Sequence, residues 1–225
     1  LAADYDVLIT NARIADGTGS PLIKGNVAIK EQRIVAIGEV KGSAETTIDA
    51  ANQVVAPGFI DVHTHSEDIA SKSEAENFVR MGVTTIITGN CGYSRTDVGA
   101  FFKELDDQGI TLNVATLIGH GSVREQGMGG RFIRAPNEEQ LKTMQSLVEQ
   151  AMKDGAVGMS TGLIYVPGSF AKTDEIVALA KIVSAHGGSY ASHMRHETAK
   201  IFGAMDELIT IAREAKVRAE LSHSK

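Results

Sequence analysis

The chain has 225 residues, 43% of them hydrophobic, and its 22 basic against 28 acidic residues give a formal charge of -6. This balance is typical of a globular protein and excludes a nucleic-acid binder that works through a basic surface. Apolar runs are short and broken by Gly, Thr or Asp, so none reaches the roughly 20 residues of a membrane-spanning helix. We therefore expect no nucleic-acid or membrane partner and a cytoplasmic location. The chain begins at Leu1 without a methionine, which leaves processing and a periplasmic location open.

Residues 1–56 have the pattern of a small β-sheet domain. Apolar side chains alternate in short runs, as in Val7 and Ile9, and turn residues such as Asp16-Gly17 separate the runs. This pattern predicts short antiparallel strands joined by tight turns. Because so small a sheet cannot close a core alone, we expect it to pack on another element or to receive strands from elsewhere.

From Pro57 onward the pattern changes to strands that alternate with helices. The clearest helix begins after Asn137, a predicted N-cap with Gln140 at the third helical position, and ends at Gly155. The predicted strands are GFIDVH (58–63), VTTIITG (83–89), LNVATLIG (112–119), AVGMSTG (156–162), SYASHM (189–194) and VRAELSH (217–223). Such alternation indicates parallel strands with helices outside, in a (β/α) barrel or a doubly wound sheet.

Chemically active side chains at the strand ends favour the barrel. They are Asp61, His63, His65, Asn90, Cys91, His120, His193 and His223. A (β/α)8 barrel collects such residues at the C-terminal face of its strands. A nucleotide-binding sheet would place its signal in one glycine-rich turn that opens a helix, and no periodic helix directly follows the glycine-rich stretch 119–130. The predicted fold is thus α/β, a TIM-type (β/α)8 barrel over 57–225 with about six strands present.

The sharpest local motif is His63-Thr64-His65. Residues two apart on a strand face the same side, so both imidazoles can reach one metal ion while Thr64 turns away. Zinc binds imidazole nitrogen at about 2.0 to 2.1 Å, and two histidines at a barrel strand end suit it. The alternative is a pair of surface histidines that only form hydrogen bonds.

Cys91 is the only cysteine, so it forms no internal disulfide. One interpretation is a buried small apolar residue, the usual environment of a free cysteine. Its place just after a strand, in a turn with Gly92, favours a metal ligand instead, because a bound thiolate is deprotonated and can bridge two ions.

These segments together resemble a known family. PGFIDVHTHSED, GVTTIITGNCGYS, GAVGMSTGLIYVPG, YASHMRHE and ELSHSK are similar to the D-aminoacylases and N-acyl-D-amino-acid deacylases of the amidohydrolase superfamily, and the N-terminal DVLITNARIADGTG is similar to the opening strands of their small β-sandwich. The resemblance implies a zinc-dependent hydrolase that cleaves N-acyl-D-amino acids to a free D-amino acid and a carboxylic acid. It implies a small β-sandwich over 1–56 and a metal-dependent barrel over 57–225 that is incomplete at its C-terminus.

The resemblance also implies roles for individual residues. His63 and His65 match the ligands of one metal site, which is weakly occupied in this branch, and Cys91 and His223 match ligands of a tightly held zinc. Residues expected to face the substrate pocket are Tyr190, His193 and Arg195. For Arg195 the alternatives are a two-pronged contact with the substrate carboxylate and a salt bridge that tethers a loop.

Three further histidines receive weaker assignments. His186 and His196 are expected to be structural or solvent-facing, and His120 either lines the pocket or forms a hydrogen bond within its loop.

The segment from Pro57 is shorter than the roughly 250 residues of a complete barrel. A further zinc histidine and the general-base aspartate are therefore expected beyond Lys225, in a remaining C-terminal part that acts as partner to this one. No residue of this chain is assigned as the base. Two other functions stay open: another metal-dependent amidohydrolase acting on a cyclic amide or a different N-acyl substrate, and a barrel without catalysis that binds or assembles.

Overall fold

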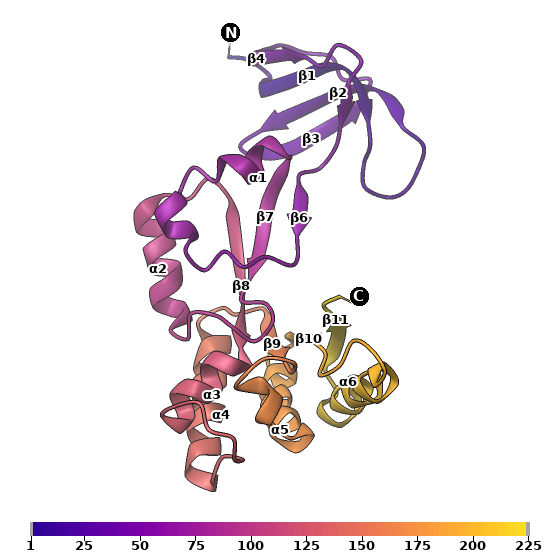
Figure 1. Cartoon of the computed structure of the whole chain (residues 1–225). Coiled ribbons are helices and arrows are strands. Elements are labelled where there is room, and N and C mark those ends of the chain that lie inside the picture. The colour runs from indigo at the N-terminus through magenta and orange to yellow at the C-terminus, as the bar shows by residue number, and fades with distance from the viewer. Residues whose placement is uncertain (1, 224–225) are drawn as a thin grey trace. The chain divides into compact units, whose positions relative to one another are not determined.

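The computed structural model describes residues 2–223 (Figure 1). The chain divides into two compact units, Leu1–Gly58 and Phe59–Lys225. This division falls two residues after the boundary expected between 56 and 57. That the first unit belongs to a β-sandwich stays a prediction.

The first unit is a five-stranded sheet built around its longest strand. Its strands are β1 (Tyr5–Ile14), β2 (Ile23–Lys30), β3 (Arg33–Gly38), β4 (Ala44–Asp49) and β5 (Val54–Val55). The pairs β1–β2 and β2–β3 are antiparallel, as predicted. The expectation of antiparallel pairing throughout is wrong for β4 and β5, which both pair with β1 in parallel. The reason is a crossover after β3 that returns the chain to the start of β1, where Tyr5 is aligned with Ala44.

The second unit is built on a six-stranded parallel sheet in strict chain order. Its strands are β6 (Phe59–Asp61), β7 (Val83–Thr88), β8 (Asn113–Gly119), β9 (Gly158–Gly162), β10 (Ser189–His193) and β11 (Arg218–Leu221). All six predicted strands are confirmed, each within a few residues of its expected bounds. Every neighbouring pair is parallel. A doubly wound sheet would reverse its strand order at a switch point, and this sheet does not.

Helices connect these strands and cover the outside of the sheet (Figure 1). They are α1 (Glu76–Arg80), α2 (Val98–Gln108), α3 (His120–Met128), α4 (Glu138–Lys153), α5 (Thr173–Ala185) and α6 (Ile201–Ala215), with 3₁₀ turns η1 (Ile69–Lys72) and η2 (Gly168–Phe170). The main core lies between sheet and helices, where Ile118 and Met159 of the strands pack with Val148 and Leu179. Burying each such side chain contributes about 1.5 to 3 kcal/mol.

The sequence pattern indicates no periodic helix directly after the glycine-rich stretch 119–130, whereas the structure places helix α3 within this stretch. Val123, Arg124 and Met128 of this helix are all buried. The buried face of this helix also contains His120, Gly121 and Arg124, so apolar residues do not repeat at the helical period and the sequence pattern does not indicate the helix.

Helix α4 confirms its predicted start. The Asn137 side chain accepts a hydrogen bond from the backbone N–H of Gln140 (2.8 Å), and the Gln140 side chain accepts one from the backbone N–H of Asn137 (3.1 Å). This capping box satisfies two N–H groups that the helix leaves without partners.

We expect Asn137→Ala to lower the free energy of unfolding by about 1 kcal/mol, because the exposed first turn of α4 loses its cap. The measurement is urea denaturation followed by circular dichroism. Asn137→Ser is the matched control, since serine is a comparable N-cap. Equal losses in both variants would contradict a capping role.

Candidate metal centre

Four candidate ligands stand at the C-terminal ends of four parallel strands. His63 follows β6, Cys91 follows β7, His193 ends β10, and His223 follows β11. Because parallel strands deliver their C-terminal ends to the same rim of a barrel, residues far apart in sequence meet there. Cys91 and His193 are buried, whereas His63 and His223 are partly exposed.

The distances suit a single bound ion. The Cys91 sulfur lies 3.5 Å from Nε2 of His63 and 3.6 Å from Nδ1 of His193. Two donors on one tetrahedral zinc, at sulfur and nitrogen bond lengths of about 2.3 and 2.0 Å, lie about 3.5 Å apart. Ligand atoms of His63, Cys91 and His223 all lie within 4.8 Å of one another. The donor set therefore fits a zinc ion.

The surroundings of His63 favour the neutral form of its imidazole, which is the form that binds a metal. Burial lowers the pKa of His63, and the neighbouring His65 and His223 lower it further, against an opposite effect of Asp61. Only a neutral imidazole offers a lone pair to a metal, so these surroundings favour metal binding.

Glu197 is a member of the cluster that the sequence analysis missed. Its Oε1 lies 3.2 Å from Nδ1 of His223 and 3.4 Å from Nε2 of His193, and ligand atoms of the three residues form a second group within 4.8 Å. Within the described part of the chain, Oε1 of Glu197 and Nδ1 of His223 are buried without a hydrogen bond. The available signal was sequence spacing, since Glu197 follows His193 by four residues in YASHMRHE.

The other expected site residues lie at different depths. His193, expected in the substrate pocket, lies among the candidate ligands. His65 is exposed, with its ring centroid 5.4 Å from that of His63, and it is outside both ligand groups found among the described residues.

Tyr190 is fully buried, and its hydroxyl lies 2.8 Å from Oγ1 of Thr161. Burial raises the pKa of Tyr190 to about 12, so the phenol stays protonated.

Arg195 adopts the second of the two arrangements weighed for it. Its Nε and Nη2 donate to the carboxylate of Glu207 at 2.9 Å, Nη2 also donates to the carbonyl oxygen of Ala171, and Nη1 donates to that of Ser169. The pairing with Glu207 raises the pKa of Arg195. These contacts tie the loop around η2 to α6, and a contact with substrate stays a prediction.

The remaining histidines do not join the cluster. His120 is fully buried, and its Nε2 lies 2.9 Å from Oε1 of Glu175, which also accepts from Nε of Arg124. His186 lies 3.1 Å from Glu149 on the outer helices, and His196 is exposed.

The turn that carries Cys91 is held tightly by its surroundings. Cys91 has φ of 53°, a left-handed conformation that costs a non-glycine residue about 1 to 3 kcal/mol. The buried Asn90 donates from Nδ2 to the carbonyl oxygens of Ile87 (3.1 Å) and Thr64 (3.4 Å), which links the turn to the His63-Thr64-His65 segment. Next to the turn, a Cβ at Gly162 would overlap the carbonyl oxygen of Cys91. The thiol position therefore depends on a glycine in β9.

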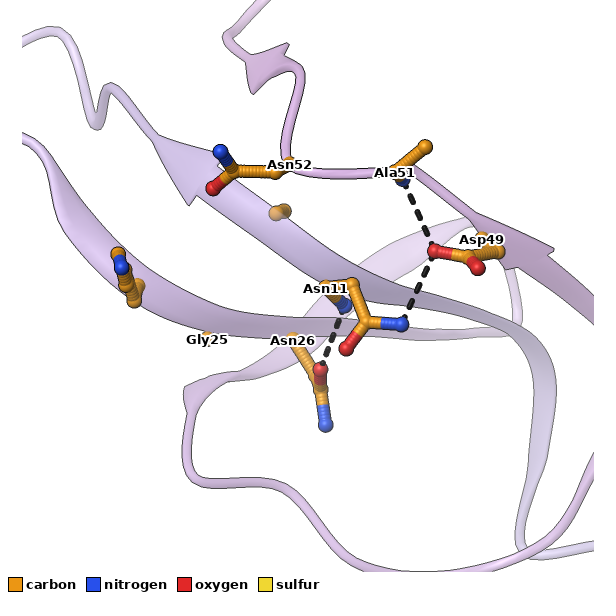
Figure 2. A pocket seen from close by; sticks show the side chains of 8 residues that line it. Asn11, Gly25, Asn26, Asp49, Ala51 and Asn52 are labelled. Atoms are coloured by element: carbon orange, nitrogen blue, oxygen red, sulfur yellow. Dashed lines mark hydrogen bonds between the residues drawn. The ribbon is translucent and has the colours of Figure 1, made fainter.

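A separate hollow of about 560 Å³ lies on the small sheet (Figure 2). Oδ1 of Asp49 accepts from Nδ2 of Asn11 (3.0 Å) and from the backbone N–H of Ala51 (2.9 Å), while Asn26 accepts from the backbone of Asn11. The N–H of Ala51 is the main cause that lowers the pKa of Asp49. Because these polar groups satisfy one another and no His or Cys lines the hollow, we do not take it as the functional site.

In the described residues, no helix is both long and apolar enough to cross a membrane.

The family model described as the amidohydrolase family matches residues 46–194, which include the strand ends that carry His63, Cys91 and His193. The chain belongs to the amidohydrolase family. The D-aminoacylase of Alcaligenes xylosoxydans xylosoxydans is 35% identical over 98% of this chain and 51% of its own length. This amidohydrolase chain thus spans about half the length of the curated relatives it matches.

Two solved structures confirm the predicted barrel fold. N-acyl-D-glutamate deacylase from Bordetella bronchiseptica, complexed with zinc and a phosphonate inhibitor, has a TM-score of 0.90 at 34% identity over 96% of this chain and 50% of that one. A D-aminoacylase with a binuclear metal centre, described by one-metal activation and second-metal attenuation, has a TM-score of 0.94 at 31% identity over 98% and 52%. The resemblance of this amidohydrolase to both groups of deacylases is confirmed.

We expect Gly162→Ala to lower the zinc content of this amidohydrolase, because the added methyl displaces the Cys91 carbonyl and with it the thiol. Overpacking of this kind costs about 1 to 3 kcal/mol of stability. The measurements are elemental analysis and urea denaturation.

The matched control is Gly203→Ala in α6, where a Cβ meets no atom within 4 Å. It should keep its zinc and gain up to about 1 kcal/mol from helix propensity. Full zinc occupancy in Gly162→Ala would show that the turn does not need this glycine.

Proposed function

We propose that this chain forms the metal-binding part of a zinc-dependent hydrolase that cleaves the amide bond of N-acyl-D-amino acids. The products are a free D-amino acid and a carboxylic acid. The observation that carries the proposal is the convergence of one thiol and three imidazoles, from Cys91, His63, His193 and His223, at one rim of the barrel. A barrel without catalysis has no physical need to gather such donors.

The relatives support the metal and the substrate class. The deacylase that holds zinc with a phosphonate inhibitor is a structural neighbour over most of this chain, and the D-aminoacylase neighbour has a binuclear centre. We propose one tight zinc site held by Cys91, His193 and His223, with His63 adjoining it. His65 is proposed for a second, weaker site next to His63.

The residues of the chain prepare the site for this chemistry. Zinc bound there would polarise the amide carbonyl and lower the pKa of a bound water towards 7. Cys91 brings a negative charge that holds the cation, and the lowered pKa of His63 keeps its ring neutral. Glu197 faces Nε2 of His193 while Nδ1 faces the thiol. A carboxylate on that side favours the proton on Nε2 and leaves Nδ1 as the ligand atom.

We also propose that a remaining C-terminal part of the same enzyme completes the barrel and supplies the general-base aspartate. The sheet ends at β6 on one edge and at β11 on the other, and Phe59 and Ile60 of β6 are exposed. Such edges are sites for further pairing. The relatives, about twice as long, have the length that this requires.

The proposed activity predicts that the full natural protein hydrolyses N-acetyl-D-amino acids faster than their L counterparts. Chelation should abolish hydrolysis, and added zinc should restore it, because the polarising cation is removed and returned. The measurement is release of free amino acid. A zinc-loaded protein that leaves the D series intact would point to another amidohydrolase substrate.

The ligand assignment predicts that Cys91→Ala and His193→Ala each lose bound zinc, because each removes a donor that no neighbouring group replaces. Elemental analysis after gel filtration measures the stoichiometry. His196→Ala is the matched control, since His196 is exposed three residues after His193 and should keep its zinc. An unchanged zinc content in His193→Ala would show that His193 is not a ligand and would favour its predicted role in the substrate pocket.

A further inference from the structure

The turn that carries Cys91 is bridged by a hydroxyl from another strand. Oγ of Ser160, in β9, accepts from the backbone N–H of Gly92 at 2.9 Å and donates to the carbonyl oxygen of Gly89. These two glycines flank Asn90-Cys91, and the β-turn itself is Asn90-Cys91-Gly92-Tyr93, in which the N–H of Tyr93 donates to the carbonyl oxygen of Asn90 (3.2 Å). A hydrogen bond from the fourth residue to the first is the one that closes a β-turn, so this turn closes on its own. The Ser160 hydroxyl adds a second link, from the residue before the turn to the third residue of the turn.

Close backbone packing lets the hydroxyl reach the turn. Ser160 lies on β9 and is paired in register with Gly119 of β8, and it has no exposed surface. A Cβ at Gly119 would come within 2.6 Å of the Gly92 backbone, so the turn lies directly over β8. The strand between the turn and Ser160 thus presents only backbone at this point.

The two hydrogen bonds of Ser160 restrain the backbone conformation that directs the Cys91 thiol. Cys91 has φ of 53° and Gly92 has φ of 84°, so two successive residues are left-handed. For Cys91 this conformation is unfavourable and persists only where the surroundings hold it. A single hydroxyl that binds Gly89 and Gly92, on either side of Asn90-Cys91, adds such a restraint to the turn's own hydrogen bond.

We propose that Ser160 is the positioning residue of the Cys91 thiolate: its hydroxyl links Gly89 to Gly92 across Asn90-Cys91 and so aims the sulfur at the metal. This deepens the proposed function and rests on it, because it takes Cys91 as a ligand. Ser160 itself binds neither metal nor substrate.

Cobalt, which reports thiolate ligation through a charge-transfer absorption, tests the proposal on the metal-depleted full natural protein. Ser160→Ala should weaken cobalt affinity by about 10- to 100-fold, as is typical when a group that orients a ligand is removed. It should also reduce or shift the thiolate charge-transfer band. Ser160→Thr, which keeps the hydroxyl, should restore the band.

The matched control is Thr161→Val. Thr161 is the next residue of β9, is equally buried, and bonds to Tyr190 and Ser192 instead of the turn. Loss of the Thr161 hydroxyl should leave both the charge-transfer band and the cobalt affinity unchanged. If Ser160→Ala behaves like Thr161→Val, with a normal band and affinity within about twofold of the parent, the hydroxyl is only a structural hydrogen bond and the proposal is wrong.

Two measurements separate the possible failures. Amide exchange in the parent protein needs no variant: the Gly92 N–H should exchange slowly, and fast exchange would overturn the proposal even if Ser160→Ala does not fold. Cys91→Ala tests the underlying ligand assignment. Loss of the band in Cys91→Ala but not in Ser160→Ala would reject the positioning role alone, whereas a band that survives in both would reject the ligand assignment.

Discussion

The candidate metal centre depends on one steric constraint: the turn that carries Cys91 lies against the backbone of two neighbouring strands, with no room for a side chain between them. Gly119 and Gly162 are the points of contact. This close approach brings the sulfur within 3.6 Å of an imidazole from a strand 102 residues later. Protein interiors are packed too densely to absorb even one extra methyl group without a shift. The position of the thiol therefore follows from the packing of the barrel rim.

Polar groups at this rim fall into two classes with different tasks. The cluster of Cys91, His63, His193, His223 and Glu197 holds closely spaced donor atoms, some of them without hydrogen bonds in the described part of the chain. The pairs of Arg195 with Glu207, and of His120 with Glu175, instead bind structural elements together. Five metal-ligating side chains that face one another in this way are a site where an ion is expected.

The fold was largely predictable from the sequence, and the candidate site only in part. Alternation of apolar strands with helical segments indicated the six parallel strands, because a strand that is buried on both faces has a recognisable composition. His63, Cys91 and His223 could be found because each follows a strand end. Glu197 was not found, because its spacing of four residues from His193 indicates proximity only on a helix, and residues 194–197 form a loop. Helix α3 was missed because its buried face contains His120, Gly121 and Arg124, which removes the amphipathic pattern.

The sequence by itself determined the class of fold, the family and the kinds of ligand atom, because strand periodicity and the spacing in His63-Thr64-His65 are local properties. Only the tertiary structure decided which of those atoms meet. It brought His193 next to Cys91, paired Arg195 with Glu207, and placed Ser160 beside the Cys91 turn. Each of these contacts joins residues from different strands, helices or loops. Such contacts depend on the register and packing of the barrel, which no local pattern in the sequence records.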